Sequence, residues 1–150
     1  MKYRKDGINI ERKTIASKYG HLFLDVLQYR NNNRIAIISY FANDNDLSDY
    51  EFDDKDLFAD ITINLNLPIN NYDEGFINAD INHKEFGIVD LLKKERIIEK
   101  SYGMKKNNMG SYELVKFNLE KLKEYDYAGV EKFLDSINIG NDELDYKIKI

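Results

Sequence analysis

The sequence predicts an α+β fold, in which an antiparallel β-sheet of four to six strands is packed on one face by two or three helices. Three observations favour it: alternating apolar and polar residues dominate the earlier part of the chain, helical spacing appears later, and the turns are short. Strands joined by hairpin-length turns pair antiparallel, and one face of such a sheet is usually covered. At 150 residues, the chain is expected to form a single domain over 1–150.

The first two strands are predicted over residues 21–30 and 34–41. Apolar residues occupy every second position along one face of each run, and three successive asparagines separate the runs. Asparagine tolerates the left-handed backbone of tight turns. A hairpin is therefore expected here.

Further strands are predicted over 61–67, 112–118 and 144–150. The first alternates most regularly, and Pro68 ends it because proline has no backbone N–H to donate. The C-terminal run alternates from Leu144 to the last residue, which predicts an edge strand.

Two segments show helical spacing. The segment 86–94 is preceded by Asn82 and Glu85, which match an N-cap and its capping-box partner. The segment 119–137 carries apolar residues three and four positions apart. Asp126 and Gly129 interrupt it, so a short helix followed by a longer one is expected.

The composition restricts the chemistry of the protein. No cysteine is present, which excludes disulfides, thiolate catalysis and cysteine-ligated metal sites. A charged run follows Met1, and the apolar stretch 35–42 is too short to span a bilayer. We expect a cytoplasmic protein without a membrane segment.

The charge of the chain is segregated along its length. The net charge is −5, yet residues 1–18 carry +4 and residues 93–123 carry +5. Residues 44–60 hold eight acids against one lysine, a charge of −7, and residues 124–145 carry −6. Such segregation indicates surfaces of opposite sign.

No catalytic or metal-binding motif accompanies these charges. Asp44, Asp46 and Ser48 match the first ligand positions of a calcium-binding EF-hand loop, but Asp49 replaces the required glycine and Lys55 the final glutamate. The two histidines have no partner at metal-ligand spacing on a predicted helix. We therefore expect a non-enzymatic protein with no metal and no cofactor.

The acidic segment is predicted to bind a partner by imitating nucleic acid. Carboxylates at roughly phosphate spacing can occupy a basic groove that normally holds DNA or RNA, and interleaved aromatic side chains can anchor the contact. The predicted partner-binding residues are Asp44, Asp46, Asp49, Tyr50, Glu51, Phe52, Asp53, Asp54 and Asp56.

The basic regions support an alternative function. A small nucleic-acid-associated accessory module would use the basic faces at 1–18 and 93–106, as a monomer or as a homodimer. In the run 102–111, two glycines bracket two lysines and would offer backbone amides to an anion. This run lacks the ending of a P-loop, so a hairpin loop is the simpler interpretation.

Residues 58–122 resemble a family of small proteins from Firmicutes and Bacteroidetes mobile elements and phages, known only as a domain of unknown function. The matching blocks begin at Phe58, Gly75 and Tyr112 and read FADITINL, GFINADIN and YELVKFNLEKL. An acidic loop insertion at 43–60 and a C-terminal helix and strand extension at 119–150 depart from the family. No catalytic residues come with the resemblance.

The resemblance implies a small accessory protein of a mobile element. Combined with the acidic segment, it leads us to expect a counter-defence inhibitor, similar to anti-CRISPR proteins, that occupies the nucleic-acid-binding groove of a host nuclease such as a CRISPR effector.

Overall fold

A computed structural model describes residues 2–5, 8–42, 57–78 and 87–148 of the chain. Its strands fall into two four-stranded antiparallel sheets and a two-stranded N-terminal ribbon, with two helices. The strands are β1 Lys2–Lys5, β2 Ile8–Glu11, β3 Ile15–Ser17, β4 Gly20–Gln28, β5 Ile35–Phe41, β6 Leu57–Asp60, β7 Thr62–Ile63, β8 Glu74–Ile77, β9 Ile98–Asn107 and β10 Gly110–Phe117. The helices are α1 Ile88–Lys94 and α2 Leu119–Ile148. The α+β class is confirmed, although two sheets form where one was predicted.

The first sheet has the strand order β3-β4-β5-β6. Its centre is the predicted hairpin of β4 and β5, in which Leu22 pairs with Phe41 and Gln28 with Ile35. The asparagine turn is held by side chains, because Asn31 and Asn32 both hydrogen-bond to Asn64. This prediction is confirmed.

The second sheet has the order β7-β8-β10-β9. Residues 57–63 carry the chain from the first sheet to the second, and Gly75 of β8 allows the sheets to approach closely. A Cβ on Gly75 would lie 3.2 Å from Phe117 and 3.5 Å from Ile35. One main core forms from residues of both sheets and both helices.

The predicted strand 61–67 was mostly wrong, since only Thr62 and Ile63 pair, with β8. After Ile63, hydrogen bonds from side chains replace the backbone hydrogen bonds of a strand pair. The Arg34 guanidinium donates to the Leu65 carbonyl at 2.9 Å, and the Asn64 amide is committed to the asparagine turn. Alternation placed the apolar residues correctly, but it did not reveal these competing side-chain hydrogen bonds.

The N-cap residues of the two helices are Gly87 and Asn118, and the sequence pattern predicted neither. Gly87, with a positive φ of 59°, occupies the N-cap position of α1, so the proposed Asn82 cap was wrong; Asn82 and Glu85 lie outside the described residues. Asn118 caps α2 by accepting a hydrogen bond from the Lys121 N–H at 3.1 Å.

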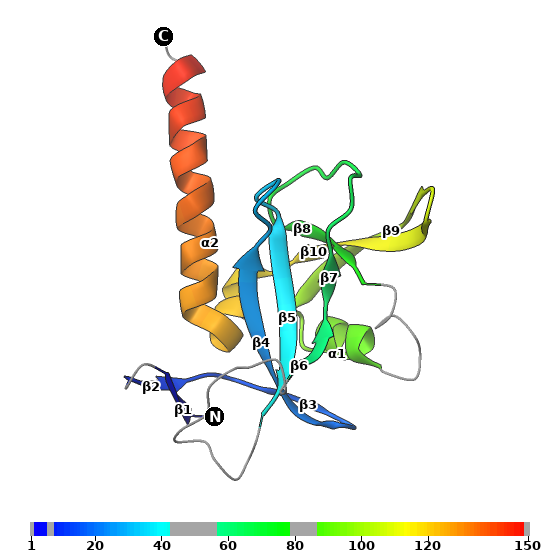
Figure 1. The fold of residues 1–150 in the computed structure, drawn as a ribbon, viewed down its shortest axis with the longest axis vertical. Helices are drawn as coiled ribbons and strands as arrows, with labels where there is room; N and C mark the ends of the chain where they lie inside the picture. Colours follow the sequence, from blue (N-terminus) through cyan, green and yellow to red (C-terminus); the bar gives the residue numbers. More distant parts are fainter. Residues whose placement is uncertain (1, 6–7, 43–56, 79–86, 149–150) are drawn as a thin grey trace.

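Helix α2 is interrupted at Asp126, whose φ and ψ of −155° and 80° are not helical, and this confirms the predicted break. Figure 1 shows α2 standing beside β4 and continuing past the sheets. The predicted C-terminal strand was wrong, because the helix runs through Ile148.

The kink in α2 covers an open strand edge. Beyond Leu22, the side of β4 that faces away from β5 has no strand partner within the described residues. Arg12 donates to the Leu24 carbonyl there, and Asp126 accepts a hydrogen bond from the Val26 N–H at 2.8 Å. Unpaired edges otherwise invite pairing with another chain.

Candidate partner-binding site

The acidic segment is attached to the first sheet by two neighbouring strands. The chain leaves β5 after Phe41 and returns at Leu57 in β6, its antiparallel neighbour, so both attachment points lie at one end of the sheet. The nine predicted partner-binding residues from Asp44 to Asp56 all lie outside the described residues. Of the acids in 44–60, Asp60 is described, and it is exposed at the end of β6.

An aromatic cluster lies at these attachment points. The Phe58 ring is 5.1 Å from the Phe41 ring in an edge-on arrangement and 5.7 Å from the Tyr19 ring. Tyr19 and Leu57 remain 44% and 42% exposed. Exposed aromatic and aliphatic side chains beside a charged segment provide the apolar contact that anchors protein interfaces.

Among the described residues, no group of three or more histidine, aspartate or glutamate side chains is placed to hold a metal ion. His21 is exposed, and its Nδ1 lies 3.2 Å from the Thr14 hydroxyl. His83 is outside the described range.

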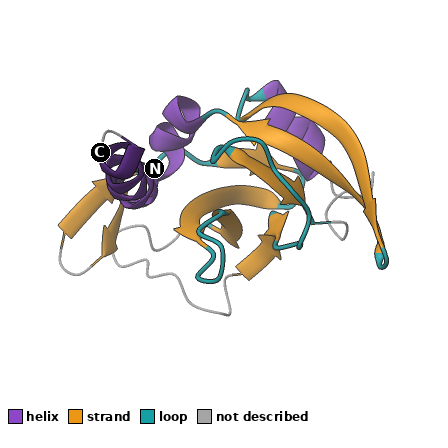
Figure 2. Cartoon of the chain, turned by 90° about the horizontal axis from the view of Figure 1, so that it is seen from above, coloured by secondary structure: helices purple, strands orange, loops and turns teal. Residues whose placement is uncertain are grey.

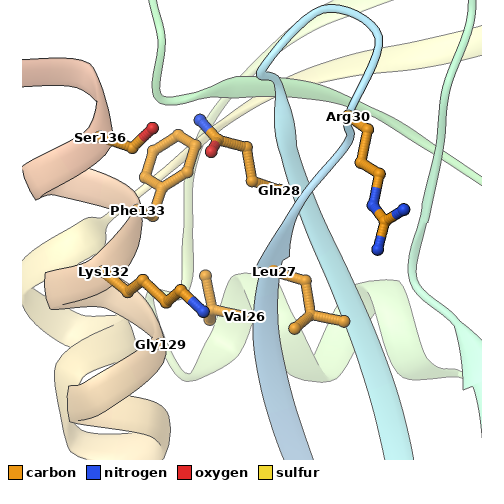
Figure 3. A pocket seen from close by; sticks show the side chains of 8 residues that line it. All are labelled: Val26, Leu27, Gln28, Arg30, Gly129, Lys132, Phe133 and Ser136. Atoms are coloured by element: carbon orange, nitrogen blue, oxygen red, sulfur yellow. The ribbon is translucent and has the colours of Figure 1, made fainter.

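A groove of about 470 Å³ follows the seam between α2 and β4 (Figure 3). Val26 and Gln28 of β4 point toward Phe133 and Lys132 of α2. Arg30 lies on the other side of β4 and points away from Lys132. The two cations therefore do not converge on one ligand atom. We therefore interpret this groove as the boundary along which α2 packs on β4, and we propose no ligand for it.

The strands β9 and β10 form a long ribbon that projects from the side of the molecule opposite α2 (Figure 1) and reaches beyond the other elements in Figure 2. Only its base is buried on β9, at Ile98. The run 102–111 is thus a strand pair with a turn at residues 108–109, where the Met109 N–H donates to the Asn107 side chain. The run is therefore a β-hairpin, as the simpler interpretation predicted.

A β-bulge shapes the middle of the ribbon. Tyr102 and Gly103 together lie opposite Leu114, because Ser101 pairs with Val115 and Met104 with Glu113. Gly103 has a φ of +83°, which glycine adopts without strain. Such a bulge bends the strand and redirects its side chains.

A second groove, of about 430 Å³, lies between the ribbon and the loop that follows β7. Leu67, Pro68 and Leu114 supply its apolar lining. Its polar lining consists of Asn70, Tyr102, Lys105 and Lys106 and contains no carboxylate.

The lysines of this region differ in their partners. Lys93 bonds to Glu113 at 3.0 Å, and Lys116 bonds to Glu99 at 3.1 Å. Within the described part of the chain, Lys105 and Lys106 have no salt-bridge partner. In the basic face predicted over 93–106, the charge of Lys93 is therefore neutralised by a salt bridge. The charges of Lys105 and Lys106 are not, within the described residues.

Two carboxylates, those of Glu74 and Asp73, lie near Tyr102 but are not part of the lining of the second groove. Glu74 is fully buried and accepts a hydrogen bond from the Asn70 N–H at 2.9 Å. Burial, together with the adjacent Glu74 carboxylate, raises the pKa of the Tyr102 hydroxyl. Burial also raises the pKa of Asp73, and the Lys116 ammonium 3.9 Å away offsets this only in part.

A family model described as a domain of unknown function, DUF4313, matches residues 23–137. The chain belongs to the DUF4313 family. The match extends beyond the resemblance over 58–122, and it spans both the acidic segment and most of the described body. No curated protein and no solved structure matches the chain. In the described residues of this DUF4313 protein, no helix has the length and apolar character needed to cross a membrane.

Proposed function

We propose that this DUF4313 protein is a non-enzymatic binding protein whose acidic segment occupies the nucleic-acid-binding groove of another protein. The specific form that we propose is a counter-defence inhibitor, similar to anti-CRISPR proteins, acting on a host nuclease. The single observation that carries the proposal is the charge of −7 over residues 44–60. A basic groove that evolved for phosphates attracts such a surface at long range and increases the association rate.

The surroundings of the segment support this function. Its two ends connect to adjacent strands of one sheet, so both lie at the same end of that sheet. Tyr19 and Leu57 offer exposed apolar surface beside it. The basic ribbon belongs to the second sheet, whereas β5 and β6, the strands that flank the acidic segment in the chain, belong to the first.

The test is a charge-removal experiment on the intact chain. In the variant, Asp49, Asp53, Asp54 and Asp56 become Asn and Glu51 becomes Gln. A matched control removes the same number of charges elsewhere, at the described acids Asp90, Glu95, Glu99, Glu120 and Asp135. Inhibition of DNA cleavage by a purified CRISPR effector nuclease is measured, together with competition between the protein and DNA for that nuclease.

We expect the wild type and the control to inhibit at a stoichiometric ratio and the charge-removal variant to lose inhibition while keeping its circular dichroism spectrum. Equal inhibition by the variant would reject the acidic surface. If the proteins captured from a host lysate include none that handles nucleic acid, the proposed class of partner is wrong.

A further inference from the structure

The β9–β10 ribbon and the groove beneath it combine features that suit one kind of ligand. The groove is large enough for a planar ring with its substituents, because small-molecule sites begin at roughly 300 Å³. Tyr102 supplies ring surface and Leu67 and Pro68 supply aliphatic surface, while Lys105 and Lys106 supply positive charge at the rim. A flat ring joined to an anionic group is the chemistry of a nucleotide.

The lysines are distributed along the ribbon. Lys100 lies 5.0 Å over the Tyr102 ring, and Lys106 is six residues further along the strand. At about 3.3 Å per residue, this separation is roughly 20 Å, so one phosphate cannot contact every lysine. A ligand with several phosphates in a row can contact more of these lysines than a single phosphate can.

An exposed methionine at the tip of the ribbon supports the same interpretation. Met109 is 85% exposed there, whereas Met104 pairs with Glu113 and therefore lies on the face opposite Leu114 and the groove. Methionine side chains adapt their shape to flat apolar surfaces and contact aromatic rings favourably. Unpaired bases present such surfaces, whereas a duplex keeps its bases stacked and cannot insert one into the groove.

We propose that the β9–β10 ribbon binds a single-stranded nucleic acid, with one base in the groove beside Tyr102 and the backbone phosphates along Lys100, Lys105 and Lys106. This site is separate from the acidic segment and does not depend on the function proposed above. It narrows the basic face predicted over 93–106 to the part whose charge is uncompensated.

The binding experiment uses the full chain and a fluorescein-labelled oligothymidylate of about 15 nucleotides, a length within the range of known single-strand sites. Fluorescence anisotropy is recorded over a series of salt concentrations. Three phosphate contacts predict that log K falls with log salt with a slope of about −2, since each contact on a single strand contributes about −0.7.

The decisive variant is Lys105→Gln/Lys106→Gln, and its matched control is Arg30→Gln/Lys132→Gln. The control removes the same charge from two exposed positions that have no salt bridge in the described residues. We expect the ribbon variant to bind at least about tenfold more weakly, with a salt slope near −0.7, and the control to bind within about twofold of the wild type. Equal losses in both variants would show nonspecific attraction and overturn the site.

Two further measurements distinguish binding of a single strand from binding of a duplex and from binding of a free mononucleotide. A duplex of the same length is expected to bind more weakly than the single strand, and equal or tighter duplex binding overturns the single-strand assignment. Free adenosine monophosphate is expected not to displace the oligonucleotide; displacement would mean a mononucleotide site. Absence of oligonucleotide binding by the wild type at low salt rejects the proposal altogether.

Discussion

The Asp126 carboxylate accepts a hydrogen bond from the Val26 N–H at 2.8 Å, one hundred positions earlier in the chain. Its other oxygen accepts from the Gly129 N–H at 3.1 Å, and Arg12 lies 3.6 Å away. One buried side chain thus restarts helix α2, caps the open edge of β4 and balances a buried guanidinium.

Replacing Asp126 with Ala is expected to destabilise the fold by about 3 kcal/mol, because it breaks a buried ion pair and removes one of the carboxylates that balance the Arg12 charge, while Asp25 stays 3.7 Å away. Two backbone N–H groups lose their acceptor as well. Urea unfolding followed by circular dichroism measures the change. Glu124→Ala is the control, since Glu124 forms only exposed salt bridges and its loss is expected to leave stability close to that of the wild type. Equal effects of the two substitutions would contradict the structural role of Asp126.

Gly129→Ala tests the close approach of α2 to β4. In an ordinary helix, alanine is more stable than glycine by about 1 kcal/mol. Here a Cβ would lie 2.1 Å from the Asp126 carboxylate and 2.6 Å from the Val26 carbonyl. We expect the substitution to lower the free energy of unfolding by about 2 kcal/mol, as overpacking does.

The double variant provides the control for this prediction. In the Asp126→Ala background, one of the two clashes is gone, so Gly129→Ala is expected to cost less there than in the wild type. Additive losses in thermal or urea unfolding would show that the two residues act independently.

Asp73 predicts a pH dependence of stability. Burial raises the pKa of its carboxyl, and its buried Oδ1 has no hydrogen-bond partner in the described structure. The folded protein therefore holds this proton more tightly than the unfolded chain. Stability from this group is present below the ordinary aspartate pKa and decreases as the pH rises through the raised folded value.

In the Asp73→Asn variant, the stability is expected no longer to decrease as the pH rises through the folded pKa of Asp73. The variant is expected to be at least as stable as the wild type at neutral pH. Urea unfolding at a series of pH values, with a carboxyl NMR titration of Asp73, measures both effects. Lys116→Met should raise the pKa of Asp73 further, because the ammonium lowers it. A titration of Asp73 at or below the ordinary aspartate value would contradict this account.

The sequence patterns located several elements but not their partners. Alternation identified the β4–β5 hairpin and strand β10, and Asp126 with Gly129 identified the break in α2. Nothing in the local sequence indicated that Asp126 would accept a hydrogen bond from Val26, or that Arg12 would be only 4% exposed. Those contacts join residues far apart in the chain, so local periodicity carries no information about them.

The candidate sites show the same division. The acidic segment and the lysines were evident from composition, whereas the groove beside Tyr102 required the loop after β7 to lie against the ribbon. The difference between neutralised Lys93 and uncompensated Lys105 also depended on tertiary packing, which places Lys93 of α1 against Glu113 of β10.

The sequence by itself determined the α+β class, the segregation of charge and the absence of cysteine chemistry, because these follow from residue types and short-range periodicity. Only the tertiary structure decided that the strands form two sheets and that the C-terminal run is helical. Leu144 and Ile148 fit both a period of two and helical spacing, and the helix that restarts after Asp126 extends at little cost once nucleated. Long-range packing and side-chain hydrogen bonds selected between patterns that were locally equivalent.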